Sequence, residues 1–328
     1  MTKNADSYIA ENRSDIRNTQ ANFIEVTDRG ASRDLSFPRN TIEVTVEVEV
    51  YKRSLNSSLI SGHPDGSSYG SGRGEAGDVR GGWTLVEDTE ASAVWTKDGR
   101  NAVRDALDGQ AGGIAEAVLG HGTRDASTSD ADLQDRQATV YATGTKDDRK
   151  TTRGHGIYLF QDHNEAGTEF GLLDGNGRLL CRVTVGDVAP TKDEEVRAEV
   201  VLTFDGYGVG ESVVTDEGER TIADSVRLDS VTVGLLEMAW GTGTTSFSTS
   251  DTSLTSEEIR KNVQRELDLE TIRTFSKLFK SEPSTQPVGL GEVAVFDNNG
   301  NIVWATAFDP EEKDDSAPLT TTVGFRIR

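Results

Sequence analysis

The sequence predicts a mainly β protein, built as two tandem duplicated β-sandwich-like units with at most three short helices. Two observations predict this class. Several stretches alternate apolar and polar residues, which is the period of a half-buried strand. The order of short motifs in the middle of the chain also recurs in the C-terminal part, and repetition of a domain-sized unit indicates a duplicated domain and not a solenoid.

Residues 1–40 contain few apolar residues and no sustained period, so they are predicted to form an extended N-terminal arm outside the core of either unit. Their scattered apolar residues are spaced like anchors that an extended peptide could lay into grooves on neighbouring subunits. These residues are Ile9, Phe23, Ile24, Leu35 and Phe37.

The first β unit is assigned to residues 41–205 and the second to residues 206–328. The first opens with "TIEVTVEVEVY" from Thr41, whose strict alternation predicts a strand. Residues 61–82 form a glycine-rich stretch that cannot bury enough surface to fold alone, so a long surface loop is expected there. A short helix is predicted in "GRNAVRDALDG", with Gly109 at its C-terminal end.

The repeat is visible without a gap at an offset of 121 residues, where "GHGT" from Gly120 meets "GTGT" from Gly241 and both are followed by "STSD". We expect glycine in these turns because chain reversal requires positive φ. The Ser, Thr and Asp oxygens should accept hydrogen bonds from nearby backbone N–H groups. Thr255 and Glu258 match a capping box, which predicts a helix in "SEEIRKNVQREL" from Ser256.

Further along, the offset becomes 123, and "EFGLLD" from Glu169 meets "EVAVFD" from Glu292. The sequences "DGNG" and "DNNG" follow, and each predicts the turn of a β-hairpin between alternating strands. Cys181 lies in an alternating stretch and is expected to be a small buried residue, and a single cysteine excludes an intrachain disulfide. The tryptophans fall at apolar positions of strand patterns, where core packing is favoured over glycan stacking. They are Trp83, Trp95, Trp240 and Trp304.

The composition is strongly acidic, with 56 Asp and Glu against 34 Lys and Arg and a net charge of −22. Dispersed negative charge argues against nucleic acid as a partner, since phosphate binding requires clustered positive charge. It is also typical of proteins that work at molar salt, and an ordinary acidic mesophilic protein is the alternative. No apolar run is long enough to span a bilayer, and the N-terminus lacks an apolar signal core, so we expect neither membrane insertion nor a Sec signal.

The repeated order of strand, "GTGTT", "SDTSL", "LGEVAVFD", "NNGNIVWATAFDP" and a closing strand resembles a module of tail proteins from tailed phages and haloarchaeal tailed viruses. Residues 231–328 match this pattern well, although Ala294 stands where the family usually has glycine. Residues 105–204 keep "EFGLLD" with Gly171 but have a divergent middle. The resemblance implies a virion tail component, in the baseplate or a fibre, and it brings no catalytic residues.

The sequence predicts no catalytic, cofactor-binding or metal site. His155 and His163, with Asp162 and Glu165, could be imagined as metal ligands, but seven residues within a strand-like stretch separate the two imidazoles. His63 and His121 are expected in a loop and a turn. The turns "DGNG" and "DNNGN" lack the alternating acids and the distal glutamate of an EF-hand loop, so a hairpin turn is favoured over a calcium site. A paired-carboxylate glycosidase is disfavoured, because any acidic chain offers such pairs.

The leading hypothesis is a structural virion protein of a haloarchaeal tailed virus that acts in assembly and host attachment. It would be made in the host cytoplasm and end in the virion tail as a homo-oligomer. Its expected partners are other tail proteins and a host cell-surface glycan or S-layer. A capsid turret or decoration protein is the alternative, and a halophilic secreted hydrolase is a third class that the missing signal peptide disfavours.

Overall fold

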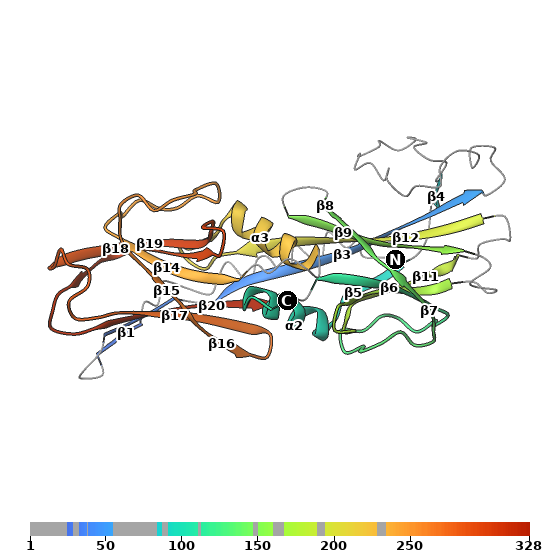
Figure 1. Cartoon of the computed structure of the whole chain (residues 1–328), viewed down its shortest axis with the longest axis horizontal. Helices are drawn as coiled ribbons and strands as arrows, with labels where there is room; N and C mark the ends of the chain where they lie inside the picture. Colours follow the sequence, from blue (N-terminus) through green and yellow to red (C-terminus); the bar gives the residue numbers. More distant parts are fainter. Residues whose placement is uncertain are drawn as a thin grey trace, which may run out of the picture.

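The structure is a computed structural model that describes residues 25–28, 33–37, 39–54, 84–86, 91–110, 113–146, 150–159, 167–188, 194–227 and 234–328. The fold is mainly β, with three sheets and two short helices in these ranges, as predicted. Figure 1 shows an elongated molecule with one repeat at each end and the two helices meeting in the middle.

The two repeats contain the same elements in the same order, namely one strand, one helix and seven further strands. The first repeat, residues 91–207, comprises β5 (Ala91–Trp95), α2 (Lys97–Leu107), β6 (Ile114–Gly120), β7 (Arg136–Tyr141), β8 (Thr143–Lys146), β9 (Thr151–Leu159), β10 (Gly167–Asp174), β11 (Leu179–Val188) and β12 (Glu194–Tyr207). The second repeat, residues 213–327, comprises β13 (Val213–Val214), α3 (Asp216–Arg227), β14 (Leu235–Gly241), β15 (Glu257–Asn262), β16 (Gln264–Asp268), β17 (Thr271–Leu278), β18 (Val288–Asp297), β19 (Ile302–Lys313) and β20 (Leu319–Ile327).

Each repeat forms its own five-stranded antiparallel sheet, and the strand order is equivalent in the two. The orders are β5-β11-β10-β6-β7 and β13-β19-β18-β14-β15. Both hairpin turns predicted from "DGNG" and "DNNG" are confirmed, because they join β10 to β11 and β18 to β19. Gly177 and Gly300 adopt positive φ there, which explains the glycine in each turn.

The remaining strands form one ten-stranded sheet that belongs to both repeats. Strands β8, β9 and β12 contribute one side, and β16, β17 and β20 contribute the other. Strand β3 (Asn40–Ser54) lies between them, antiparallel to β12 and parallel to β20. The two halves of this sheet therefore run in opposite directions, as a two-fold relation between the repeats requires. Strand β4 (Thr84–Leu85) pairs with β3.

The predicted arm contributes two strands, β1 (Glu25–Asp28) and β2 (Arg33–Ser36). β2 pairs in parallel with β20, and Leu35 is 1% exposed in the core. The prediction that all of residues 1–40 lie outside the core is therefore wrong for β2, because one buried leucine and a pairing strand suffice to make it part of the sheet. Ile9, Phe23 and Ile24 lie outside the described residues, as does the glycine-rich stretch 61–82.

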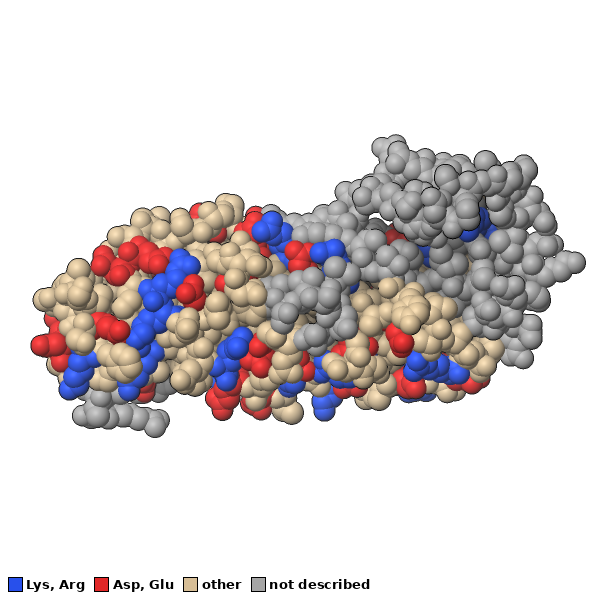
Figure 2. Space-filling model, in the orientation of Figure 1, with Lys and Arg blue, Asp and Glu red and all other residues tan. Residues whose placement is uncertain are grey.

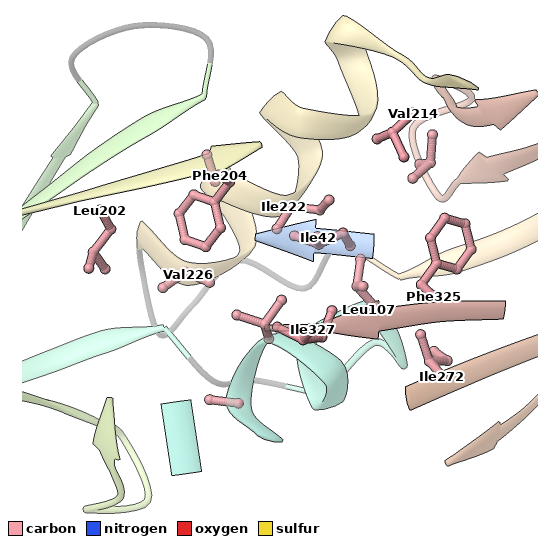
Figure 3. Packing of buried hydrophobic residues seen from close by; sticks show 14 of the residues in the cluster. Ile42, Leu107, Leu202, Phe204, Val214, Ile222, Val226, Ile272, Phe325 and Ile327 are labelled. Atoms are coloured by element: carbon pink, nitrogen blue, oxygen red, sulfur yellow. The ribbon is translucent and has the colours of Figure 1, made fainter. Parts of the chain in front are cut away.

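The helices connect the repeats reciprocally. α2 packs on β11 of its own repeat and on β17 and β20 of the other, while α3 packs on β19 and, across the junction, on β8, β9 and β12. Figure 3 shows side chains from both repeats around this junction, with Ile222 and Val226 of α3 near Phe204 of β12. These residues belong to one continuous core cluster. Strand β12 also extends to Tyr207, beyond the unit boundary placed after residue 205.

The helix predicted over Ser256–Leu267 is wrong, and residues 257–268 form β15 and β16 instead. The apolar residues Ile259, Val263 and Leu267 are spaced by four, which fits one face of a helix and equally one face of a strand. Thr255 does not cap a helix, since its backbone N–H donates to Glu292. The chain instead passes at Val263 from the five-stranded sheet to the ten-stranded one.

The predicted helix at Gly99–Gly109 is confirmed as α2, and Gly109 has positive φ at its end. The equivalent α3 was not predicted, although its signal lies in the repeat at an offset of 119. Thr96 and Thr215 each accept a hydrogen bond from the backbone N–H three residues later, at 3.0 and 2.9 Å. The donors are glycines in both helices, and a repeat search extended upstream would have aligned them.

Candidate functional site

The motifs that repeat in the sequence come together at one place in each repeat. We call residues 121–135, between β6 and β7, connector one, and residues 242–256, between β14 and β15, connector two. A fully buried glutamate lies under each, Glu169 on β10 and Glu292 on β18. Each glutamate is opposite the last residue of the strand that enters the connector, Gly120 or Gly241.

Both glutamates hold the far end of their connector through its backbone. The N–H groups of Gln134 and Asp135 donate to the Glu169 carboxylate at 3.0 and 2.7 Å, and that of Gly122 donates at 3.0 Å. Thr255 and Ser256 donate to Glu292 at 3.0 and 2.7 Å. The buried glutamate that the two repeats share is therefore a clamp that fixes the connector to the sheet.

The Gly-x-Gly turns need glycine for a reason other than the predicted one. Neither turn has a positive φ at its glycines; instead, the glutamate approaches too closely for a side chain. A Cβ at Gly120 would lie 2.5 Å from Oε1 of Glu169, and one at Gly241 would lie 2.3 Å from Oε1 of Glu292. The glycines are thus explained by the clamp.

The "STSD" segments bond to their own backbone as predicted. Ser127 and Ser248 each donate their N–H to an aspartate three residues later, at 2.8 Å in both connectors. Each connector also reaches the first turn of its helix, where the N–H of Lys97 donates to Thr128 and that of Asp216 donates to the carbonyl oxygen of Thr249, both at 2.7 Å. Each connector is therefore fixed both to the sheet, by the buried glutamate, and to the helix of its own repeat.

Beneath connector one lies a charged network that has no counterpart under connector two. The Arg182 guanidinium, which is fully buried, lies 2.8 Å from Glu169 and 2.7 Å from Asp130, and it donates to the carbonyl oxygens of Arg124 and Asp125. Arg124 reaches Asp130 from the solvent side at 2.6 Å. Burial alone would leave these charges unstable, but every one of them has a partner.

The network lowers the pKa of both carboxyl groups. Burial raises the pKa of Glu169, but hydrogen bonds from the backbone of Asp135 and Gln134 and from Arg182 outweigh it, so that the pKa lies below its usual value. For Asp130, burial likewise acts upward and is outweighed by Arg182, the Ser127 N–H and Arg124. Both groups are consequently ionised in the folded protein at neutral pH.

Connector two fills the same space with an apolar side chain. At the position of Arg182 the second repeat has Ala305, and at the position of Ala126 it has Phe247. Phe247 packs against a small cluster that includes Ala305, Leu254 and Phe296. The equivalent cluster under connector one contains Leu133 and three other apolar residues. The first repeat therefore has a large buried base on the sheet and a small residue on the connector. The second repeat has a small residue on the sheet and a large one on the connector.

The remaining predicted residues occupy structural positions. Cys181 is buried in β11, and Trp95, Trp240 and Trp304 lie in the core, as expected. Trp83, His63, His163, Asp162 and Glu165 lie outside the described residues. His155 is on β9 and His121 begins connector one. In the part of the chain that the structure describes, no group of three or more His, Cys, Asp or Glu side chains is arranged to hold a metal ion.

Neither helix in the described ranges is long and apolar enough to cross a membrane. No protein-family model, curated protein or solved structure matches the chain. The geometry of the site is that of two surface connectors, each held by hydrogen bonds to a sheet and a helix of its own repeat.

Proposed function

We propose that the chain is a structural component of the tail of a haloarchaeal tailed virus, in the baseplate or a fibre, where it acts in assembly and host attachment. Other tail proteins and further copies of the chain are its partners in this proposal, with a host cell-surface glycan or S-layer as the attachment target. It has no enzymatic role in this proposal.

One observation carries most of the weight. The residues behind the resemblance to tail proteins, namely the Gly-x-Gly turn and the glutamate that begins the following motif, are separated by about fifty residues of chain yet form a single clamp in both repeats. The resemblance therefore coincides with a packing device and not with a chance string of small residues. Polar residues serve here to fix loops, which is what a building block of a particle requires.

The charge distribution supports the halophilic part of the proposal. Figure 2 shows acidic side chains at many separate places on the visible face, on both sides of a stripe of basic side chains in its left half. Such a surface stays hydrated and soluble when molar salt screens its charges.

Immunogold electron microscopy of purified virions, with antibodies against the recombinant chain, tests the proposal. Gold at the tail tip or fibres is the expected result. Gold spread over the capsid would favour a turret or decoration protein, and a chain absent from particles but abundant in infected-cell or culture fluid would refute the virion assignment.

A further inference from the structure

The outer strand of each five-stranded sheet occupies the same position in the two repeats. β7 pairs only with β6, and β15 only with β14, among the described residues. Each strand therefore has one row of backbone N–H and C=O groups that faces away from its sheet. Proteins usually protect such edges, because another strand can pair with them.

The β15 edge is protected by charge and by a neighbouring loop. Arg260 binds Glu257 at 2.7 Å, and Lys261 binds Glu282 of the loop after β17 at the same distance. The Lys261 ammonium also lies 4.2 Å from the centre of the Phe279 ring. A strand that approached β15 would have to displace these ion pairs and the loop.

The β7 edge lacks this protection. At the offset of 121, Thr139 stands where β15 has Arg260, and Val140 stands where it has Lys261. No charged residue follows Arg136 in the strand, which ends at Tyr141. Tyr141 is 92% exposed, so no described residue packs over its side chain at this end of the edge. The duplication thus provides an internal comparison, with one protected edge and one open edge in the same fold.

We propose that two copies of the chain pair β7 against β7, antiparallel, and so join their five-stranded sheets into one. The backbone fits this pairing. The N–H of Ala142 donates to the carbonyl oxygen of Ala115 in β6 at 3.1 Å. Because backbone N–H groups alternate in direction along a strand, those of Thr139 and Tyr141 point away from β6. Pairing centred on Val140 places Thr139 of each copy opposite Tyr141 of the other, and each such pair can exchange backbone hydrogen bonds in both directions.

A second copy fits this edge better than other occupants because of charge. With a net charge of −22, two copies repel each other across most surfaces, whereas β7 presents no acidic residue between Arg136 and Tyr141. In the antiparallel pairing centred on Val140, the second copy brings the uncharged side chains of Thr139, Val140 and Tyr141 against the same residues, in a closed two-fold interface. The pairing should strengthen as salt screens the rest of the surface. It concerns the isolated chain and stands whether or not the chain is a tail protein.

Light scattering after size-exclusion chromatography, from low to molar KCl, measures the pairing. The variant Tyr141→Pro removes an outward N–H, and Asn262→Pro is its matched control on β15, where Val263 donates inward to Leu236. Thr139→Lys adds a charge without a backbone change. We expect a wild-type dimer at molar KCl that Asn262→Pro retains, and a rise of about tenfold or more in the dimer dissociation constant for Tyr141→Pro and Thr139→Lys.

Amide hydrogen exchange on the wild-type protein gives a readout that needs no variant. The amides of Thr139 and Tyr141 should exchange slowly in the dimer and fast on dilution to monomer. A wild-type protein that is monomeric at every salt and protein concentration would overturn the proposal. This holds even if the β7 edge of that monomer bound an extended segment of another protein. A dimer that keeps its affinity in Thr139→Lys, or that leaves these two amides unprotected, would overturn it as well.

Discussion

Replacing Arg182 with alanine tests how connector one is held. The substitution removes the base that contacts both Glu169 and Asp130, two carboxylates that are each under a tenth exposed. Breaking a buried ion pair by deleting one partner costs about 3–5 kcal/mol, because the other charge stays buried. Glu169 keeps three backbone N–H donors and Asp130 keeps Arg124. We therefore expect the lower end of that range, about 3 kcal/mol of unfolding free energy.

The second repeat supplies a rescue. The double variant Arg182→Ala with Ala126→Phe reproduces the arrangement of Ala305 and Phe247, in which an aromatic ring fills the space. Alone, Ala126→Phe should destabilise, since the ring would meet the guanidinium in a filled interior. Together, the two substitutions should show a favourable coupling of about 1–2 kcal/mol.

Urea unfolding at fixed molar KCl, followed by tryptophan fluorescence, gives the four free energies of this cycle. Phe247→Ala is the matched control, because it removes an apolar filler and no charge. The reasoning fails if Arg182→Ala costs less than about 1 kcal/mol, or if the two substitutions are simply additive.

Four further outcomes follow from charge and packing. The carboxyl groups beside Arg182 have folded pKa values below their unfolded ones, so the stability they add is full above about pH 4.5 and lost as pH falls through the folded values. Acid unfolding should thus begin at higher pH in Arg182→Ala than in wild type, and an unchanged acid midpoint would contradict this. Thermal melts should rise steeply from low to molar KCl, given a net charge of −22, and a flat profile would remove the halophilic inference. Gly99→Ala and Gly218→Ala should each cost about 1–3 kcal/mol, because the new Cβ would lie 2.2 or 2.3 Å from a carbonyl oxygen, whereas Gly289→Ala, with 3.6 Å of space, should be near neutral in the same urea assay. Leu35→Ala should cost about 2–4 kcal/mol, as expected for a core residue, and a neutral result would return this residue to the arm.

The sequence revealed the duplication and the hairpins because those features are local. A turn of the "DNNG" kind encodes its own geometry, and an exact offset aligns the motifs without any structure. The glutamate clamp cannot be predicted from the sequence, because it joins residues that are far apart along the chain. Glu169 and Gly122 are far apart in sequence and meet only after β10 pairs with β6, so the sequence alone indicates a positive φ at the glycines, whereas the structure explains them by a carboxylate close to each turn.

The wrong helix shows a limit of periodicity. A spacing of four satisfies both helix and strand, and Arg260 and Lys261, which follow Ile259, have long charged side chains that a helix surface and a strand surface both accommodate. Their partners decide the outcome, and Glu282 is twenty-one residues away from Lys261. Phe247 and Arg182 illustrate a second limit. The space between connector and sheet is filled by a sheet residue, Arg182, in one repeat and by a connector residue, Phe247, in the other, and neither residue alone indicates this in the sequence.

The reciprocal packing of the helices explains why the two repeats form one body. Thr152 of β9 donates its hydroxyl to the carbonyl oxygen of Ala223 in α3 at 2.9 Å, and Arg100 of α2 binds Glu270 beside β17 at 2.8 Å. Each repeat thus covers strands of the other, and β3 joins both halves of the shared sheet. Within such a body the two copies need not remain equivalent, because the core they share keeps each one folded while its surface changes. The charged network under connector one, the phenylalanine under connector two, and the open and protected sheet edges are differences of this kind. The duplicated chain therefore presents two different ends, although its repeats share one ten-stranded sheet and one core cluster.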